Sequence, residues 1–388
     1  MINIGILINS LNRGGAERVV SILSQHLLEL SENINVILIL LEEAKIFPIH
    51  PNVEIIHLGK KKLSNLIKFI ILPFYGWYLK KICFEREIEV VFSFLERSNF
   101  INVISKIYGG NYRVILNERT TPSLAYSKMS FKNHNNKLLI RLLYPRADHI
   151  IANSNGVKND LEEHFHLDKI SVIYNPIDIE SINRYKKETI TIMDRQKISE
   201  YKLILYAGRL ISDKRVVDLI SAFKIVSERM QDVVLVLLGE GEAKQSLQKR
   251  ANKLGIGPKV YFLGDVNNPY SWMSHSDCFV LPSQREGFPN VLLEAMACGC
   301  PVISTDCQSG PSEIIENKKS GILVSVGDVK KIAEAIEKVL TDKSFTKKMV
   351  KHALLRIEKF SIKNIIPQYE KIIFKKNKGK AEKFINQV

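Results

Sequence analysis

Short apolar runs alternate with segments of helical length through the first half of the chain. The segments Ala16–Leu30 and Arg97–Ile107 are long enough to form helices between these runs. The runs that predict strands are Ile2–Ile8, Ile34–Leu41, Val90–Phe94, Arg113–Asn117, His149–Asn153 and Ile170–Tyr174. Because parallel strands are joined by helical crossovers, this alternation predicts a doubly wound parallel sheet of the α/β class.

The second half of the chain repeats the pattern after a polar, irregular stretch at residues 175–200, which opens with the turn signal Asn175-Pro176. Its predicted strands are Lys202–Ala207, Val233–Leu238, Lys259–Phe262, Cys278–Leu281, Pro301–Ser304 and Gly321–Val324. We therefore expect two Rossmann-like domains, residues 1–175 and 176–360. Such sheets bind ligands at the carboxyl ends of their strands, so two of them facing each other would form a binding cleft.

One segment of the first domain, Lys60–Phe84, is apolar and aromatic in the middle and has lysines at each end. Its unbroken apolar stretch is too short to cross a bilayer, which needs about 20 residues. Trp77 and Tyr78 suit a helix lying in a membrane interface, which Pro73 would kink. An ordinary buried helix pair explains the same pattern, and the sequence leaves both readings open.

Composition agrees with two packed domains, because 45% of the 388 residues are apolar. The formal net charge is +15, and residues 343–388 hold 13 Lys and Arg against 3 acids, a net of +10. A basic tail of this kind indicates a nearby anionic surface, which could be a membrane, a nucleic acid or a phosphorylated substrate. A solubilising face is the alternative.

The amino end and the cysteines bear on the compartment. The first residues start a strand at once, without a basic region or a cleavage site, so no signal peptide is expected. The five cysteines are odd in number and none form a C-x-x-C pair. We expect buried, reduced thiols in a cytoplasmic protein.

The stretch Q-R-E-G-F-P-N-V-L-L-E at residues 284–294 places one glutamate before a turn and another inside the following helix. A helix starting near Pro289 has no capping Ser or Thr, so its amide groups and positive dipole end predict a phosphate site. Carboxylates beside phosphate would repel it, so Glu286 and Glu294 are expected to bind hydroxyls. Together these features suggest a nucleotide sugar, although each glutamate alone also fits an ordinary surface.

Two other loops follow predicted strands and carry phosphate-binding features. Arg209 and Lys214 come after the strand ending at Ala207, where a guanidinium and an ammonium could neutralise a diphosphate leaving group. A plain surface loop with an Asp213–Lys214 contact is the alternative. Gly14-Gly15 follows the first strand and lets backbone amides approach an anion.

Several known chemistries have no motif in this chain. There is no Asp-x-Asp, H-E-x-x-H, G-x-S-x-G or Walker loop, and no G-x-G-x-x-G dinucleotide fingerprint. We therefore expect no metal and no cofactor beyond a substrate nucleotide. Gly264-Asp265-Val266 ends another predicted strand, and its backbone could line a base pocket.

Together these motifs resemble the retaining family 4 glycosyltransferases. E-G-F-P-N-V-L-L-E, with its glutamates eight residues apart, is similar to that family's E-x7-E motif. G-R-L-x3-K at 208–214, G-G-A-E-R at 14–18 and G-P-S-E-I-I at 310–315 are similar to its other signatures. The resemblance implies a GT-B fold, a donor held mainly by the second domain, and a metal-independent reaction that retains the anomeric configuration. It also implies that residues 361–388 form a helix that crosses back to the first domain, plus the basic tail.

By position, the resemblance assigns roles to these motifs. Arg209, Lys214 and Glu286 are the predicted catalytic residues: the two cations would bind the diphosphate, and the carboxylate would contact the transferred sugar. Glu294 would bind the ribose. The full predicted donor site is Gly14, Gly15, Arg209, Lys214, Val266, Glu286, Gly287, Phe288, Pro289, Asn290, Val291, Leu292 and Glu294.

The chain departs from many family members in a first-domain loop that often presents a His to the donor sugar. Here the matching residues are Asn117-Glu118-Arg119-Thr120, so Glu118 and Arg119 are expected near the sugar or acceptor. The resemblance extends to bacterial enzymes that lengthen glycans linked to polyprenyl diphosphate in O-antigen, capsule or glycoprotein assembly. It implies a UDP-linked hexose or N-acetylhexosamine donor, a lipid-linked saccharide acceptor and an anionic inner-membrane surface.

Other functions are less consistent with the sequence. A nucleotide-sugar epimerase of the same architecture would need no acceptor and no membrane-directed segment. A retaining glycosidase uses two acids about 5 Å apart and has no use for a phosphate site. A nucleic-acid-binding protein would account for the net charge, but the chain has no aromatic stacking platform or recognition helix, so no nucleic-acid partner is expected.

Overall fold

A computed structural model of the chain describes residues 2–12, 14–30, 33–43, 47–59, 65–127, 131–190 and 200–375. The chain divides into two compact units, which are referred to below as unit 1, Met1–Pro176 with Ile362–Val388, and unit 2, Ile177–Ser361. Both boundaries lie one residue beyond those expected from the sequence.

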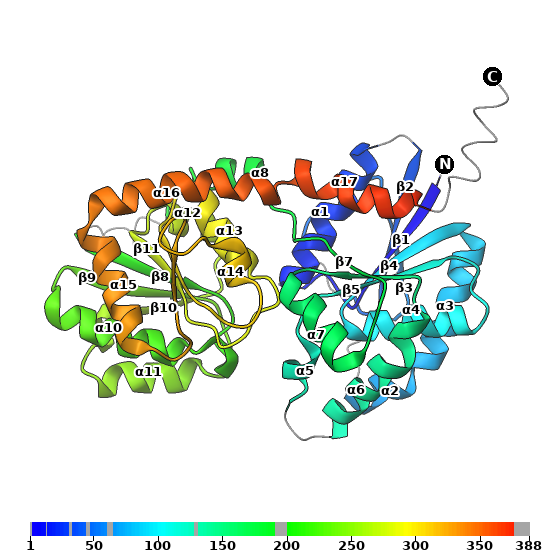
Figure 1. The fold of residues 1–388 in the computed structure, drawn as a ribbon, viewed down its shortest axis with the longest axis horizontal. Coiled ribbons are helices and arrows are strands. Elements are labelled where there is room, and N and C mark those ends of the chain that lie inside the picture. Colours follow the sequence, from blue (N-terminus) through cyan, green and yellow to red (C-terminus); the bar gives the residue numbers. More distant parts are fainter. Residues whose placement is uncertain are drawn as a thin grey trace. The chain divides into compact units, whose positions relative to one another are not determined.

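Unit 1 contains a seven-stranded parallel sheet in the order β3-β2-β1-β4-β5-β6-β7 (Figure 1). Its strands are β1 (Ile2–Ile8), β2 (Ile34–Leu40), β3 (Glu54–His57), β4 (Ile88–Phe94), β5 (Arg113–Glu118), β6 (His149–Ala152) and β7 (Ile170–Val172). The six expected strands are present, with ends shifted by up to two residues. The additional strand, β3, has four residues with both ends exposed, so it lacks the apolar run that reveals the others.

The helices of unit 1 cover both faces of this sheet. They are α1 (Gly15–Leu30), α2 (Asn65–Ile70), α3 (Leu72–Glu85), α4 (Glu96–Ile107), α5 (Pro122–Ala125), α6 (Phe131–Leu143), α7 (Asn155–Phe165) and α17 (Ile362–Phe374). One buried cluster packs α3, α4 and α6 against one face, and a second packs α1 and α17 against the other. The last helix therefore contributes Ile365, Tyr369 and Ile373 to the core of unit 1, far from its neighbours in sequence.

Unit 2 contains a six-stranded parallel sheet in the order β10-β9-β8-β11-β12-β13. Its strands are β8 (Lys202–Ala207), β9 (Val233–Leu238), β10 (Val260–Gly264), β11 (Cys278–Leu281), β12 (Val302–Thr305) and β13 (Ile322–Val324). Its helices are α8 (Ile179–Tyr185), α10 (Val216–Arg229), α11 (Lys244–Lys253), α12 (Pro269–Ser274), α13 (Asn290–Ala297), α14 (Pro311–Ile314), α15 (Val329–Thr341) and α16 (Lys343–Ile357), followed by the short turn η4 (Glu358–Phe360). All six expected strands are present.

The same strand order places a topological switch point in each sheet. In unit 1 the chain reverses direction across the sheet between β1 and β4, and in unit 2 between β8 and β11. Connections leave the two central strands toward opposite faces at such a point, which opens a crevice at the carboxyl ends of those strands. The predicted donor residues Arg209, Lys214 and Glu286 follow the two central strands of unit 2.

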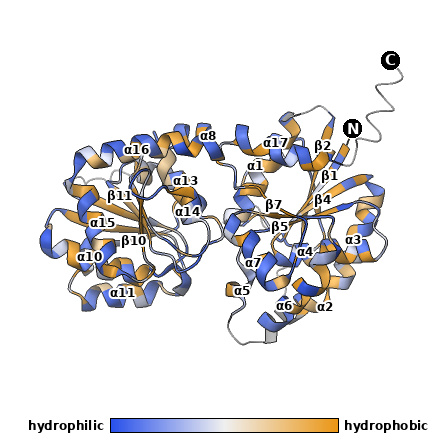
Figure 2. Cartoon of the chain, in the orientation of Figure 1, coloured by the Kyte–Doolittle hydropathy of each residue, from blue (hydrophilic) through white to orange (hydrophobic). Residues whose placement is uncertain are grey.

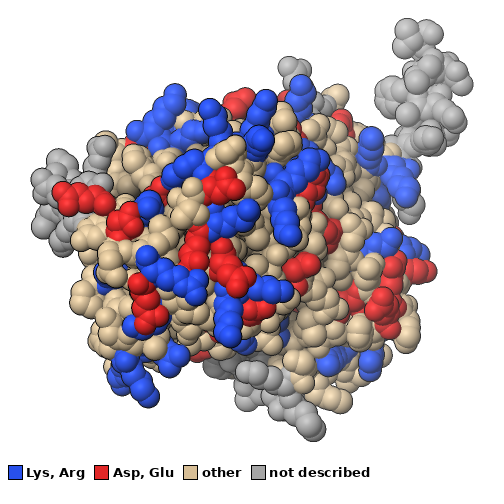
Figure 3. Space-filling model, turned by 60° about the vertical axis from the view of Figure 1, so that its left-hand side comes forward, with Lys and Arg blue, Asp and Glu red and all other residues tan. Residues whose placement is uncertain are grey.

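The structure confirms the expectation of buried thiols. The five cysteines are free and buried. On the face shown in Figure 3, basic and acidic side chains are interspersed rather than gathered by sign. No helix among the described residues is long and apolar enough to span a membrane. The predicted basic tail lies outside the described residues from Lys376 onward, as does the start of the lysine-flanked segment, Lys60–Ser64.

Candidate active site

The loops after β8 and β11 are joined by an ion pair between two predicted catalytic residues. Lys214 Nζ lies 2.5 Å from Glu286 Oε1, and the Ser283 hydroxyl donates to the same oxygen at 2.6 Å. The two side chains of the ion pair are only 17% and 10% exposed. Partial burial reduces solvent screening, so the pair fixes the ammonium and the carboxylate beside each other at the switch point.

A second ion pair holds the same two loops together. Arg285 Nη2 lies 2.6 Å from Asp213 Oδ2, and the Gln284 amide donates to the Asp213 carbonyl at 2.9 Å. The expected alternative, a local Asp213–Lys214 contact, is therefore not what the structure shows. Asp213 and Lys214 each pair with a residue of the β11 loop instead, because neighbouring strands bring the two loops side by side.

Arg209 is exposed at the carboxyl end of β8. The Tyr206 hydroxyl donates to the Arg209 carbonyl at 2.9 Å and so fixes the backbone that carries this guanidinium. Burial first, and then the nearby Glu286 carboxylate, raise the pKa of Tyr206 well above its usual value. Tyr206 therefore stays protonated and remains a hydrogen-bond donor at the base of the loop.

The helix that follows Glu286 begins without a side-chain cap, as the sequence predicts. α13 starts at Asn290, its N-cap is Pro289, and no side chain accepts a hydrogen bond at this end. The side chain of Glu294 is on the same helix and is 7% exposed. The positive end of the α13 dipole thus lies at the switch point, near the cations of the β8 loop.

The β12–α14 connection supports the loop that precedes α13. The Ser309 hydroxyl donates to the Gly287 carbonyl at 2.8 Å. A side chain at Gly310 would place its Cβ 2.6 Å from Pro289 Cδ, and Gly310 has φ +93°. Only glycine combines this conformation with so close an approach. The residues Ser309 and Gly310, at the start of the G-P-S-E motif, therefore contact and support the E-G-F-P turn.

Two further contacts complete this support. The Thr305 hydroxyl donates to the Ser283 carbonyl at 2.5 Å, and the Phe288 ring packs 5.5 Å from that of Phe360. Sequence reasoning missed Tyr206, Ser283, Thr305 and Ser309. Three of them are small hydroxyl residues without a motif, so only their position at strand ends could have drawn attention to them.

Val266 is half-buried and follows β10, the outermost strand of the unit 2 sheet, which is separated from β8 by β9. The preceding Gly264 has φ +71°, and its carbonyl accepts a hydrogen bond of 2.7 Å from the Gly239 amide. This bond ties the end of β10 to the end of β9. The position is consistent with the predicted base pocket, which stays a prediction.

The predicted phosphate contacts of the first domain belong to unit 1. Gly15 is the first residue of α1, and Gly14 precedes it at the end of the loop that follows β1. A Cβ at Gly14 would approach the Glu17 carboxylate to 2.1 Å, so the glycine leaves room for that side chain to fold back over the helix start. The predicted contact with phosphate is not tested by this geometry.

Glu118 is buried at the end of β5 and its carboxylate is held on both oxygens. The Tyr144 hydroxyl donates to Oε2 at 2.7 Å, while the Arg119 amide and the Thr120 amide and hydroxyl donate to Oε1 at 3.0–3.2 Å. Burial, followed by repulsion from Glu96, raises the pKa of Glu118 to about 7. Glu118 thus fixes the loop that follows β5.

Arg119 is also buried, and it connects parts of unit 1. Its Nη2 donates to Asn175 Oδ1 at 2.5 Å, and its guanidinium stacks 5.6 Å from the centre of the Phe94 ring. Tyr369 of α17 lies near the same guanidinium, but its hydroxyl has no hydrogen-bond partner among the described residues. The described contacts of Arg119 thus lie within unit 1, and a contact with the donor sugar stays a prediction.

No group of three or more His, Cys, Asp or Glu side chains that could hold a metal occurs among the described residues. The expectation of a metal-independent reaction remains untested by this observation.

Two family models match the chain, and together they cover most of both units. Residues 189–356 match the family Glycosyl transferases group 1, and residues 13–181 match Glycosyltransferase Family 4. The first matched region lies within unit 2, and the second covers unit 1 from residue 13 to residue 176 and extends five residues into unit 2.

Two relatives come from Campylobacter jejuni. The first, N-acetylgalactosamine-N,N'-diacetylbacillosaminyl-diphospho-undecaprenol 4-alpha-N-acetylgalactosaminyltransferase, is 37% identical over 93% of this chain and 96% of its own length. The second, GalNAc-alpha-(1->4)-GalNAc-alpha-(1->3)-diNAcBac-PP-undecaprenol alpha-1,4-N-acetyl-D-galactosaminyltransferase, is 27% identical over 96% of this chain and 98% of its own length.

A similar solved structure is sucrose-phosphate synthase from Thermosynechococcus elongatus, with a TM-score of 0.82, 17% identity and coverage of 97% of this chain and 99% of that one. This likeness extends over both units and confirms the predicted GT-B fold. The chain therefore belongs to family 4 of the glycosyltransferases and is a hexosyltransferase.

Proposed function

We propose that the enzyme transfers an N-acetylhexosamine or hexose from a UDP-sugar to a saccharide linked to polyprenyl diphosphate. The observation that carries the proposal is the convergence of Lys214, Glu286 and the uncapped start of α13 at the switch point of unit 2. These groups combine positive charge for a diphosphate with a carboxylate for sugar hydroxyls. The product would extend a bacterial surface glycan such as O-antigen, capsule or a glycoprotein glycan.

In this proposal the positive groups stabilise the departing nucleoside diphosphate. Negative charge grows on the phosphate oxygens as the bond to the sugar breaks, and Arg209, Lys214 and the α13 dipole oppose it. Glu286 would orient the transferred sugar through its hydroxyls, and Glu294 would bind the ribose. Val266 and the backbone of residues 287–292 would surround the nucleotide.

We propose retention of the anomeric configuration without a metal. Site residues of unit 2 offer no evident nucleophile on the sugar, so the acceptor hydroxyl would attack from the face that the diphosphate leaves. The bond between the anomeric carbon and the phosphate oxygen breaks, and a bond to the acceptor oxygen forms. The leaving phosphate oxygen takes the hydroxyl proton, so atoms and charge balance.

The names of the Campylobacter relatives guide the choice of acceptor and donor. Both names describe N-acetylgalactosaminyl transfer to a saccharide on diphospho-undecaprenol. An acceptor of this type lies in a membrane, so we propose that the enzyme works peripherally at the cytoplasmic face of the inner membrane. The basic carboxyl-terminal segment suits the anionic surface there.

The proposal is tested by incubating the purified enzyme with a panel of UDP- and GDP-sugars and a polyprenyl-diphosphate-linked saccharide. Transfer should require a UDP-sugar, continue in EDTA, and give a product whose anomeric NMR coupling matches that of the donor. Inversion, or loss of activity in EDTA with rescue by a divalent cation, would refute the mechanism. Conversion of the UDP-sugar without an acceptor would favour the epimerase instead.

A further inference from the structure

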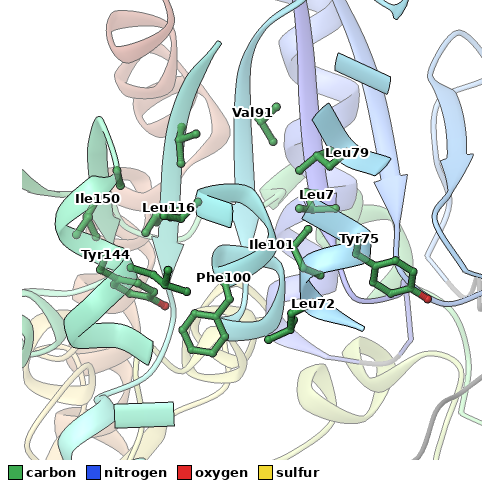
Figure 4. Packing of buried hydrophobic residues seen from close by; sticks show 14 of the residues in the cluster. Leu7, Leu72, Tyr75, Leu79, Val91, Phe100, Ile101, Leu116, Tyr144 and Ile150 are labelled. Carbon is green, nitrogen blue, oxygen red and sulfur yellow. The ribbon is translucent and has the colours of Figure 1, made fainter. Parts of the chain in front are cut away.

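The helices α2 and α3 use one face to cover the core of unit 1. Ile71 is the single residue between α2 and α3. Its amide donates to the Ile67 carbonyl and its carbonyl accepts from the Tyr75 amide, so the helical hydrogen bonding continues from α2 into α3. Pro73 lies in the first turn of α3, where a missing amide hydrogen costs little. In Figure 4, Leu72 and Leu79 point toward Leu7 of β1 and Ile101 of α4.

The opposite face of the same helices is also apolar, and it is exposed. Its residues recur at intervals of three, four, three and seven positions, which keeps them on one side of a helix. We call them the outer row: Ile67 (45% exposed), Ile70 (69%), Phe74 (54%), Trp77 (53%) and Phe84 (82%). Hydrophobic colouring is extensive over α2 and α3 in Figure 2. Single exposed apolar residues are ordinary, but five on one helical face, interrupted only at position 81, mark a binding surface.

The structure therefore combines the two readings that the sequence left open. The inner face of α2 and α3 is a buried part of the domain, as the ordinary reading requires. The outer face has the composition of a helix that lies in a membrane interface, with Phe74 and Trp77 in contact at a centroid distance of 6.2 Å.

Two lysines of α3 adjoin the outer row. Lys81 lies in the row between Trp77 and Phe84, is 53% exposed, and pairs at 3.7 Å with the exposed Glu85. An exposed pair at this distance is weak, so the ammonium can turn toward another anion. Lys80 is half-buried next to it.

A second copy of the chain is a poor fit to this surface. Stable protein–protein interfaces use about 20–30 residues on each side, and bury about 800 Å² per partner. The outer row has five side chains along one helical line, which suits shallow insertion into a bilayer better than a protein interface.

The row also leads to the sheet edge where an acceptor would be held. Lys68, next to Ile67, lies 3.1 Å from Glu42, which follows β2. Arg97, in the first turn of α4 after β4, donates to the same Glu42 oxygen at 2.7 Å. One end of the outer row therefore reaches the carboxyl ends of the central strands of unit 1.

We propose that the outer row docks unit 1 on an anionic lipid bilayer and so brings the sheet edge to a membrane-embedded acceptor; the choice of bilayer as partner rests on the proposed function. The apolar side chains enter the interface while Lys81 contacts lipid headgroups. Docking needs no change in the core packing of α2 and α3, since it uses the face that the core leaves open.

The test measures flotation with vesicles of phosphatidylcholine and phosphatidylglycerol, compared with vesicles of phosphatidylcholine alone. The variant F74S/W77S should lower the partition coefficient about tenfold or more, because it removes two half-exposed aromatic anchors. The matched control L354S/L355S changes two exposed leucines of α16 in unit 2 (40% and 65% exposed) and should bind like the unchanged enzyme. Equal binding by F74S/W77S, or equal loss in the control, would overturn the proposal.

Fluorescence gives an independent measurement on the intact protein. The chain has two tryptophans, and Trp272 is 5% exposed, so the variant Trp272→Phe isolates the signal of Trp77. Vesicles should shift Trp77 emission to the blue, and brominated lipid should quench it. An unshifted spectrum with vesicles bound would show that another surface docks. Dimerisation that F74S/W77S abolishes, with vesicle binding intact, would assign the row to a second copy.

A water-soluble acceptor analogue with a short prenyl chain separates this proposal from the proposed function. F74S/W77S should glycosylate that analogue at the rate of the unchanged enzyme, and should be slower only with acceptor in vesicles. Failure of the unchanged enzyme on both acceptors would refute the proposed function. Equal slowing of the variant on both acceptors would refute the docking role.

Discussion

Replacing Lys214 with methionine should reduce turnover far more than stability. The substitution removes the ammonium and keeps most of the apolar stem. In the structure this ammonium lies 2.5 Å from Glu286 Oε1, with the two side chains 17% and 10% exposed. The loss therefore affects both the ion pair that joins the two loops and the proposed stabilisation of the leaving diphosphate.

The two effects differ in size. At 2.5 Å and an effective dielectric constant of about 20, the Coulomb attraction is about 7 kcal/mol, but desolvation offsets most of it. The net loss of stability should be roughly 1–3 kcal/mol. Removing a preorganised group that stabilises transition-state charge costs about 3–4 kcal/mol, or 10²–10³-fold in kcat.

The assay compares initial rates of sugar transfer with thermal unfolding of the same preparations. Arg285→Met is the matched control, because the Arg285–Asp213 pair joins the same two loops at 2.6 Å and has no proposed role in the reaction. It should lose a similar amount of stability and change kcat by less than about tenfold.

Two results would refute this reasoning. The first is a kcat of Lys214→Met within a few-fold of the unchanged enzyme. The second is an equal loss of kcat in Arg285→Met, which would mean that loop stability, and not the Lys214 ammonium, limits the reaction.

Three further predictions concern packing and protonation. Gly310→Ala should destabilise unit 2 by roughly 1–3 kcal/mol more than Gly299→Ala, as measured by chemical denaturation. Both glycines have positive φ, but of the two only Gly310 has atoms within 3 Å of an added Cβ. Equal losses of stability in the two variants would contradict this. Glu118 binds its proton more tightly in the folded state, with its pKa raised to about 7, so stability should fall by up to about 3 kcal/mol as pH rises from about 4.5 to 7. Glu118→Gln should flatten this pH profile of the unfolding temperature, and an unchanged slope would exclude Glu118 as its source. Arg119→Lys should speed hydrogen exchange at the end of β4 and around Asn175, since lysine cannot stack on Phe94 and donate to Asn175 as the planar guanidinium does; unchanged exchange would show that these segments are held by apolar packing alone.

The sequence by itself determined the class of fold and predicted which residues would form a donor site. Twelve apolar runs separated by helix-length segments were enough to predict two parallel α/β domains, because strands buried on both faces are almost continuously apolar. Pro289 without a neighbouring Ser or Thr likewise predicted the uncapped start of α13. These features depend on local preferences, which a single stretch of chain carries. The short strand β3 escaped notice because its ends are exposed and polar.

Only the tertiary structure decided which residues meet. Lys214 and Glu286 are 72 positions apart, and they pair because β8 and β11 are neighbours at the switch point, a strand order that no local pattern encodes. Contact between Tyr144 and Glu118 depends in the same way on how a helix packs over β5. For α2 and α3 the sequence showed an apolar and aromatic stretch with lysines at each end, and burial then separated a core face from an open one. Apolar spacing reports that a side chain can be buried, whereas the packing of distant elements decides whether it is.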